Sequence, residues 1–198
     1  LIPHFYDVKD GRVSVFGKNV CAYDDEDLRH RIGYVQQKAV LFQGTVRSNL
    51  LWGDDSASDD DLRTALSTAQ VLDIVADKGG LDAPVEQNGA NFSGGQKQRL
   101  SVARALVRKP QILVLDDSSS ALDYATEAAM RKAILALPYK PTLFIVSQRA
   151  SSVMCADRIL VLEDGRLVGD GTHKALLANC PAYCEIYHSQ FSEEVTDA

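Results

Sequence analysis

The chain has 198 residues, of which 45% are apolar and 24% are charged, as expected for about one globular domain. Its net charge is −6 and its basic residues are scattered, which argues against a nucleic acid as partner. No run of about 18–20 apolar residues occurs, so the sequence predicts no membrane-spanning helix of its own. Four cysteines without a secretion signal favour reduced thiols.

The first segments in chain order predict an antiparallel hairpin followed by a helical insertion. Residues 11–20 form the hairpin, with Gly17 at its turn. Residues 54–61 are acidic and loop-like, whereas residues 62–75 have the composition of a helix. The stretch from about residue 45 to residue 91 therefore predicts an inserted helical subdomain.

The stretch that begins at Phe92 predicts a helix whose first turn suits a phosphate group. Ser93 can cap the helix, and Gln96 three residues later can return a hydrogen bond, which makes a capping box. Gly94 and Gly95 let backbone amides approach a ligand, and the helix dipole adds partial positive charge at this end. An ordinary well-capped helix explains the same residues.

Two unbroken apolar runs, residues 112–115 and residues 143–146, predict buried strands. Between them, residues 124–137 are rich in Ala, Leu, Glu and Lys, and Asp123 is placed as the N-cap of a helix. Strand, helix and strand together predict a parallel sheet that is covered on both faces. Further along, the Asp-Gly pair at 164–165 predicts a second hairpin.

Polar side chains follow both predicted strands. Asp116 and Asp117 end the first strand, and Gln148 comes just after the second. Ligands of open α/β sheets bind at the carboxyl ends of the strands, where two carboxylates suit a Mg²⁺ ion and a water-orienting group. A pair of solvated turn residues is the alternative interpretation.

Two other patterns are weaker. Cys180, Cys184 and His188 share one helical face and could supply three metal ligands, but a packed helix face is the favoured interpretation. The phosphate-binding pattern GxxxxGK[ST] does not occur in the sequence. The Gly-Lys pair at 17–18 is one residue too far from Gly11, and it predicts a hairpin turn instead.

Three motifs follow one another closely: FSGGQKQRLSVARAL at 92–106, ILVLDD at 112–117 and SSALD at 119–123. They resemble the signature motif, the Walker B strand and the D-loop of the ATP-binding-cassette (ABC) superfamily. Residues 34–37 resemble its Q-loop, and residues 41–50 resemble the segment that follows the Q-loop in exporters. The resemblance extends from Leu1 to about Phe191.

The resemblance implies an α/β fold with a P-loop NTPase-like parallel sheet core, β-hairpins and an inserted helical subdomain. The core would comprise residues 1–44 and 106–198, and the helical subdomain residues 45–105. It also implies that ATP and Mg²⁺ bind. The nucleotide-binding residues would be Gln37, Ser93, Gly94, Gly95, Gln96 and Asp123, and the metal ligands Asp116 and Gln37, while the signature motif would serve ATP held by an opposite subunit.

Two departures from the family pattern fall on one ATP site. Asp117 stands where the family usually has the catalytic glutamate, and its side chain is one methylene shorter. Gln148 stands where the family has the H-loop histidine, and an amide cannot carry a proton charge. The signature motif is intact apart from Phe92. This combination resembles the degenerate-site subunit of a bacterial heterodimeric ABC exporter of multidrug type.

Residues 1–7 are similar to the end of the helix that follows the Walker A loop in this family. We therefore expect a cassette that is incomplete at its N-terminus and has little or no ATPase activity alone. The implied partners are a second ABC subunit and a transmembrane domain, fused or separate, at the cytoplasmic face of the cell membrane. Two alternatives stay open: a soluble ABC ATPase of DNA repair or translation, and a nonhydrolytic module that only donates its signature loop.

Overall fold

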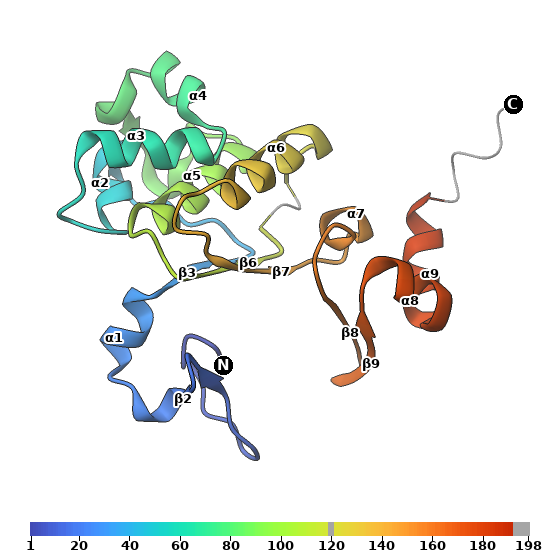
Figure 1. The fold of residues 1–198 in the computed structure, drawn as a ribbon. Coiled ribbons are helices and arrows are strands. Elements are labelled where there is room, and N and C mark those ends of the chain that lie inside the picture. The colour runs from blue at the N-terminus through green and yellow to red at the C-terminus, as the bar shows by residue number, and fades with distance from the viewer. Residues whose placement is uncertain (119–120, 192–198) are drawn as a thin grey trace, which may run out of the picture. The chain divides into compact units, whose positions relative to one another are not determined.

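The computed structural model describes residues 1–118 and 121–191, which belong to two compact units (Figure 1). The first unit spans Leu1–Val146, and the second begins at Ser147. The strands of the first unit are β1 (Ser14–Val15), β2 (Lys18–Asn19), β3 (Ile32–Val35), β4 (Gly44–Thr45), β5 (Pro84–Val85), β6 (Ile112–Asp116) and β7 (Thr142–Val146). Its helices are α1 (Asp25–His30), α2 (Val46–Leu51), α3 (Asp59–Thr68), α4 (Leu72–Asp77), α5 (Gly94–Val107) and α6 (Tyr124–Leu135), with short 3-10 helices at Val20–Ala22, Gly80–Asp82 and Gln87–Gly89.

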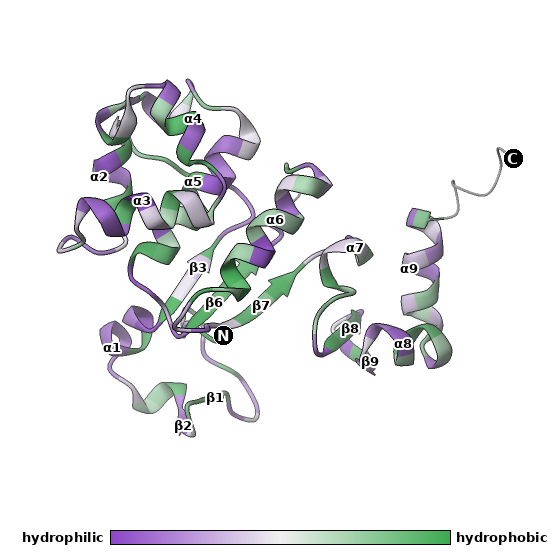
Figure 2. Ribbon diagram, turned by 45° about the horizontal axis from the view of Figure 1, so that its top comes forward, coloured by the Kyte–Doolittle hydropathy of each residue, from purple (hydrophilic) through white to green (hydrophobic). Residues whose placement is uncertain are grey.

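The centre of the first unit is a parallel sheet with the strand order β3-β6-β7. Alternate residues of β6 enter two different apolar clusters. Leu113 and Leu115 pack among the helices on one face, whereas Ile112 and Val114 pack with residues of the N-terminal hairpin and α1 on the other. Both faces of β6 are thus buried, which is why its sequence is an unbroken apolar run (Figure 2). The predicted parallel sheet is confirmed.

Strand β7 does not have the double cover that the sequence predicted. Within the described residues β6 is its only hydrogen-bonded neighbour, so β7 is an edge strand of the sheet. Phe144 and Val146 are 41% and 55% exposed. The prediction of a buried strand is wrong for β7. An apolar run shows only that its side chains favour burial, whereas the burial itself requires other segments to pack on both faces of the strand.

The N-terminal segment confirms one expectation and corrects another. β1 and β2 pair antiparallel around Phe16 and Gly17, whose φ angles of 50° and 78° suit a two-residue hairpin turn. Residues 1–7, in contrast, contain no helix, although they resemble the end of one. His4 has a φ of 54°, and its ring contacts Asp25 of α1 instead. So short a segment gains few helical hydrogen bonds, and the side-chain contacts dominate.

The helix predicted over residues 62–75 is broken into α3 and α4. Gln70 lies between them with a φ of 58°, which no helix accommodates. The start was also placed too late, because the acidic residues at 59–61 form the first turn of α3 rather than a loop. Ser58 caps that turn and Asp61 returns the bond, and acidic side chains are favoured at this end of a helix dipole.

The helices of residues 45–105 share one apolar core with the sheet. Leu66 of α3 and Leu106 of α5 belong to the same buried cluster as Leu113 and Leu115 of β6. Gly53, just after α2, is held so close to α5 that an added Cβ would clash with the Arg104 carbonyl oxygen. The exact boundaries of the helical subdomain stay a prediction.

The second unit contains α7 (Ala150–Val153), the hairpin β8 (Ile159–Glu163) and β9 (Arg166–Gly171), α8 (His173–Asn179) and α9 (Pro181–Phe191). The predicted turn is confirmed, with φ angles of 48° and 75° at Asp164 and Gly165. Across residues 1–118 and 121–191, no helix has both the length and the apolar character that crossing a membrane requires.

Of the three predicted face residues, Cys180 and Cys184 make packing contacts, whereas His188 is exposed. Cys180 is buried with Tyr183 in the apolar cluster of the second unit, and the Cys184 thiol donates to the Leu177 carbonyl at 2.9 Å. The three side chains form no metal-sized group within the described residues. The packed face that the sequence favoured is thus seen for the two cysteines only.

Candidate functional site

The glycine-rich segment forms the start of α5 through hydrogen bonds that span three residues. The Ser93 hydroxyl accepts the Gln96 N–H at 3.4 Å, and Gln96 Oε1 accepts the Ser93 N–H at 3.0 Å, so the predicted capping box is present. The two glycines differ in their surroundings. A Cβ on Gly95 would lie 2.9 Å from the Ala121 carbonyl oxygen, whereas a Cβ on Gly94 would meet only the Ala121 Cβ, at 3.7 Å. Packing therefore requires glycine at position 95, while Gly94 is exposed and open to a ligand.

A polar cluster lies at the carboxyl edge of the parallel sheet. Tyr34 near the end of β3 donates its hydroxyl to Asp116 Oδ2 at 2.8 Å, and this bond, with burial, raises the pKa of Tyr34. Gln37 Nε2 donates to Asp117 Oδ2 at 3.0 Å. Asp117 has a φ of 43°, and its N–H donates to the Val146 carbonyl at 2.9 Å. The fold thus brings Gln37, Asp116 and Asp117 together at this edge, while their roles stay predictions.

The buried Gln98 of α5 supports this cluster and was missed by sequence reasoning. Its Nε2 donates to the backbone carbonyl of Gln37 at 2.7 Å, which ties α5 to the loop after β3. The Gln98 Oε1 has no hydrogen-bond partner in the part of the chain that the structure describes. A signal existed, because a glutamine at an otherwise apolar position of a helix face needs a buried partner.

The buried Asn49 is a second support that sequence reasoning missed. Its side chain accepts the Phe42 N–H at 2.8 Å and donates to the carbonyls of Phe42 and Thr45 at 2.8 and 2.9 Å. These three bonds fix the loop between β3 and α2. Buried backbone groups outside regular structure need such partners, so a lone Asn among apolar residues indicates this role.

Two further predicted site residues, Asp123 and Gln148, make their own local contacts. Asp123 caps α6: the Thr126 N–H and hydroxyl each donate to its carboxylate at 2.8 Å, and these bonds lower the pKa of Asp123. Ser119 and Ser120 of the same motif lie outside the described residues. Gln148 belongs to the second unit, where its carbonyl accepts Gln190 Nε2 at 2.8 Å.

The donor set at the sheet edge fits a Mg²⁺ ion that completes its shell with substrate oxygens. Magnesium prefers carboxylate and amide oxygens and commonly binds through one or two carboxylates plus phosphates and water. Asp116 supplies a carboxylate with one oxygen already oriented by Tyr34, and Gln37 supplies an amide oxygen. No group of three metal-ligating His, Cys, Asp or Glu side chains is found at this edge in the described ranges, so an ion bound here would complete its shell with phosphate and water oxygens.

An exposed aromatic surface lies next to the loop between β3 and α2 that Asn49 holds. Phe42 and Trp52 stack with ring centroids 4.9 Å apart, and they are 45% and 66% exposed. The Arg104 guanidinium lies 5.7 Å from the Phe42 ring centroid, and its Nη1 is buried without a hydrogen-bond partner among the residues described. Burial lowers the pKa of Arg104. A cavity of about 280 Å³ opens here, lined in part by Tyr34, Gln36 and Ser101.

A parallel sheet with paired carboxylates at its carboxyl edge and a capped glycine-rich helix start is the arrangement of a phosphate-handling α/β domain. A family model described as "ABC transporter" matches residues 1–120. The chain belongs to the ABC transporter family. It is therefore an ATP-binding domain of that family.

The relatives agree with this assignment. The uncharacterized ABC transporter ATP-binding protein YfiB of Bacillus subtilis is 45% identical over 199 residues, which cover 100% of this chain and 34% of that protein. A second relative comes from Staphylococcus aureus, and its name describes it as a multidrug export ATP-binding/permease protein. It is 40% identical, over 96% of this chain and 33% of that protein. The structure of a bacterial Atm1-family ABC exporter with ATP bound matches with a TM-score of 0.91 and 35% identity, over 96% of this chain and 34% of that one. The chain thus spans about a third of the length of these relatives.

Proposed function

We propose that this chain is the ATP-hydrolysing part of a bacterial exporter subunit that works at the cytoplasmic face of the cell membrane. The carrying observation is the polar cluster at the sheet edge, where Gln37 and Asp117 are hydrogen-bonded and Asp116 lies beside them. Asp116 and Gln37 would hold Mg²⁺, which would neutralise charge on the ATP phosphates. Asp117 would orient the attacking water, and Gln148 would contact the γ-phosphate.

The exposed surface formed by Phe42, Trp52 and Arg104 supports a transmembrane partner. Stacked aromatic rings and a buried cation with an unused donor suit a protein segment that brings apolar side chains and an acceptor. Asn49 anchors the loop that leads from this surface to Gln37. We infer that a cytoplasmic segment of the transmembrane domain docks here, so that its movement and the state of the sheet edge are coupled.

We propose that ATP hydrolysis is slow at this chain's own site. Its signature motif would serve a faster ATP site in the partner subunit. A carboxylate shortened by one methylene at Asp117 and an uncharged amide at Gln148 both weaken hydrolysis. The open Gly94 and the capped start of α5 retain what a partner's ATP needs: free amides and a positive helix end. These features favour a heterodimer with one weak and one competent site.

The test is transport and ATP hydrolysis by the full-length protein with its partner subunit, reconstituted in lipid vesicles. We expect Asp116→Asn to weaken Mg²⁺-dependent ATP binding at this site at least tenfold, because it removes the charged metal ligand. Asp55→Asn, an exposed carboxylate in the loop before α3, is the matched control and should change nothing. Equal behaviour of the two variants, or ATP-independent transport, would contradict the proposal.

A nonhydrolytic module is the second candidate, because the same two residues that slow hydrolysis could abolish it. In that case the partner would need the signature loop for its own ATP hydrolysis, while no ATP would be hydrolysed at this chain's site. The two functions separate when the partner's catalytic glutamate is changed to glutamine. Residual hydrolysis that depends on Asp116 supports the first function, and its complete absence supports the second.

A further inference from the structure

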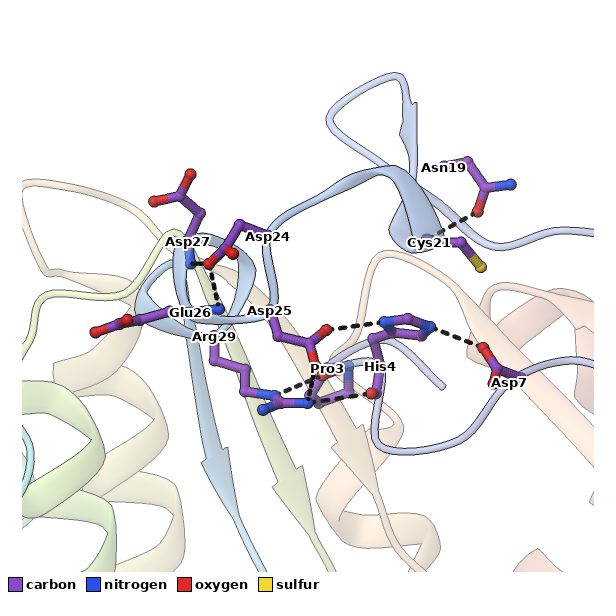
Figure 3. A network of polar contacts seen from close by, with 10 residues as sticks. All are labelled: Pro3, His4, Asp7, Asn19, Cys21, Asp24, Asp25, Glu26, Asp27 and Arg29. Atoms are coloured by element: carbon purple, nitrogen blue, oxygen red, sulfur yellow. Dashed lines mark hydrogen bonds and ion pairs between the residues drawn. The ribbon is translucent and has the colours of Figure 1, made fainter.

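A cluster of metal-binding side chains lies far along the chain from the ATP motifs, in the N-terminal part of the first unit (Figure 3). His4, Asp7 and Cys21 each offer one ligand atom, and these atoms all lie within 4.8 Å of one another. It is the one such group found in residues 1–118 and 121–191. Ligand atoms around a tetrahedral zinc ion are about 3.3–3.8 Å apart, given bonds of about 2.0–2.3 Å. The three side chains therefore need to move by only about an ångström.

The histidine is already oriented as a metal ligand. Its Nδ1 lies 3.0 Å from Asp25 Oδ1, and its Nε2 lies 2.9 Å from Asp7 Oδ1 (Figure 3). Metal-binding histidines usually donate the N–H of one ring nitrogen to a carboxylate, which fixes the ring and leaves the other nitrogen for the ion. Asp25 fills the first role, and Nε2 faces the remaining ligands. The His4 side chain is only 18% exposed, so its orientation is restricted.

The backbone and the orienting carboxylate are fixed independently of any ion. Arg29 of α1 donates to Asp25 Oδ2 at 2.9 Å, and it also donates to the carbonyls of Pro3 and His4 at 3.4 Å. The Cys21 N–H donates to Asn19 Oδ1 at 3.2 Å, which holds the cysteine in the first turn after the β1-β2 hairpin. The ligands thus come from two separate segments, both of which are anchored.

The donor types select the class of metal. Cysteine sulfur and imidazole nitrogen favour borderline and soft ions such as Zn²⁺, whereas Mg²⁺ and Ca²⁺ require oxygen ligands. The Cys21 thiol is free and exposed, and the Asp7 side chain is 84% exposed, so an ion can enter from solvent. Three protein ligands leave one position for water.

We propose that His4 Nε2, Asp7 and Cys21 bind one Zn²⁺ ion, with Asp25 as the positioning residue of His4. Binding replaces the His4–Asp7 hydrogen bond by two metal bonds, and it releases the Nε2 proton of His4 and the thiol proton of Cys21 to solvent. The ion would join the N-terminal loop to the hairpin. The site uses none of the residues assigned to ATP, so it stands or falls independently of the proposed function.

The experiment uses the full-length protein, stripped of metal and titrated with Zn²⁺ against a chromophoric chelator, and with Co²⁺ followed by absorption. We expect one Zn²⁺ per chain and a sulfur-to-cobalt charge-transfer band. Cys21→Ser should abolish the band, and Asp7→Asn should weaken Zn²⁺ binding at least tenfold. Asp25→Asn should weaken it about 10–100-fold, the usual effect of losing a carboxylate behind a histidine ligand.

Two matched controls make the result decisive. Cys155→Ser changes another exposed free thiol, and His30→Ala changes an exposed histidine of α1; both should leave Zn²⁺ affinity unchanged. Excess Mg²⁺ should not compete. The proposal is overturned if the wild-type protein shows no charge-transfer band, or if Cys21→Ser binds as tightly as Cys155→Ser. Asp7 and Cys21 are exposed, so their variants report on the ion even if a His4 variant fails to fold.

Discussion

The two motif regions of this domain hold their shapes in opposite ways. The start of α5 is fixed by bonds between Ser93 and Gln96, which are three residues apart. The sheet edge is fixed by bonds from Tyr34 to Asp116 and from Gln37 to Asp117, which join residues 82 and 80 positions apart. The start of α5 is thus a locally built module, whereas the polar cluster exists only when the sheet is assembled.

The largest expected effect concerns the sheet edge. In the proposed full-length heterodimer, Asp117→Glu combined with Gln148→His should raise hydrolysis at this chain's own site by about 10²–10⁴-fold, the usual range for general-base and positioning effects. Neither change alone should suffice, so the two should be strongly non-additive. The measurement is turnover with the partner's catalytic glutamate changed to glutamine. An unchanged rate in the double variant would place the defect elsewhere.

The second prediction concerns the start of α5. Gly94→Asp should lower turnover of the proposed heterodimer by about 10²–10³-fold, because a carboxylate at a phosphate-binding helix end would repel the ATP that this end is proposed to contact in the partner. The measurement is ATPase rate in the reconstituted protein. Gly94→Ala is the matched variant for bulk without charge, and it should be clearly less impaired. Full activity of Gly94→Asp would show that this helix end does not serve a competent site.

A third prediction separates the two glycines by packing. Gly95→Ala should lower the unfolding free energy by about 1–3 kcal/mol, because its Cβ would lie 2.9 Å from the Ala121 carbonyl oxygen. Gly94→Ala, whose Cβ has only a 3.7 Å contact, should be neutral or slightly stabilising. Thermal unfolding of the two variants side by side is the measurement. Equal melting temperatures would contradict the assignment of Gly95 to packing.

The smallest expected effect tests the link between the two regions. Gln98→Leu removes the donor to the Gln37 carbonyl, but it also removes a buried oxygen that lacks a partner within the described residues. The lost hydrogen bond and the removed unpaired oxygen act in opposite directions. The unfolding free energy should therefore fall by about 1 kcal/mol, and the melting temperature by roughly 2–4 °C. The affinity for Mg²⁺-ATP should fall with it, because Gln37 loses its support. A melting change without an affinity change would mean that α5 and the sheet edge act separately.

The sequence by itself determined the elements whose hydrogen bonds are local. The capping box at Ser93, the cap at Asp123 and the turn at 164–165 were all predicted, because each depends on residues two or three positions apart. The buried strand β6 was predicted because both of its faces need apolar side chains. The family was identified from three motifs that follow one another in a known order, and not from local propensities. The match to the ABC transporter family model confirmed it.

Only the tertiary structure decided which residues meet. The break between α3 and α4 at Gln70 and the turn at residues 1–7 override a local preference and are accompanied by contacts with other segments. Strand β7 stays exposed instead because, within the described residues, no strand pairs with its second edge. The supporting roles of Gln98 and Asn49 depend on carbonyls 61 and 7 positions away. The cluster of His4, Asp7 and Cys21 also could not be predicted from the sequence. Its residues come from two segments that the β1-β2 hairpin brings together, and no motif spacing relates them. Long-range proximity is a property of the packed chain, and a single sequence records it only where a motif is already known.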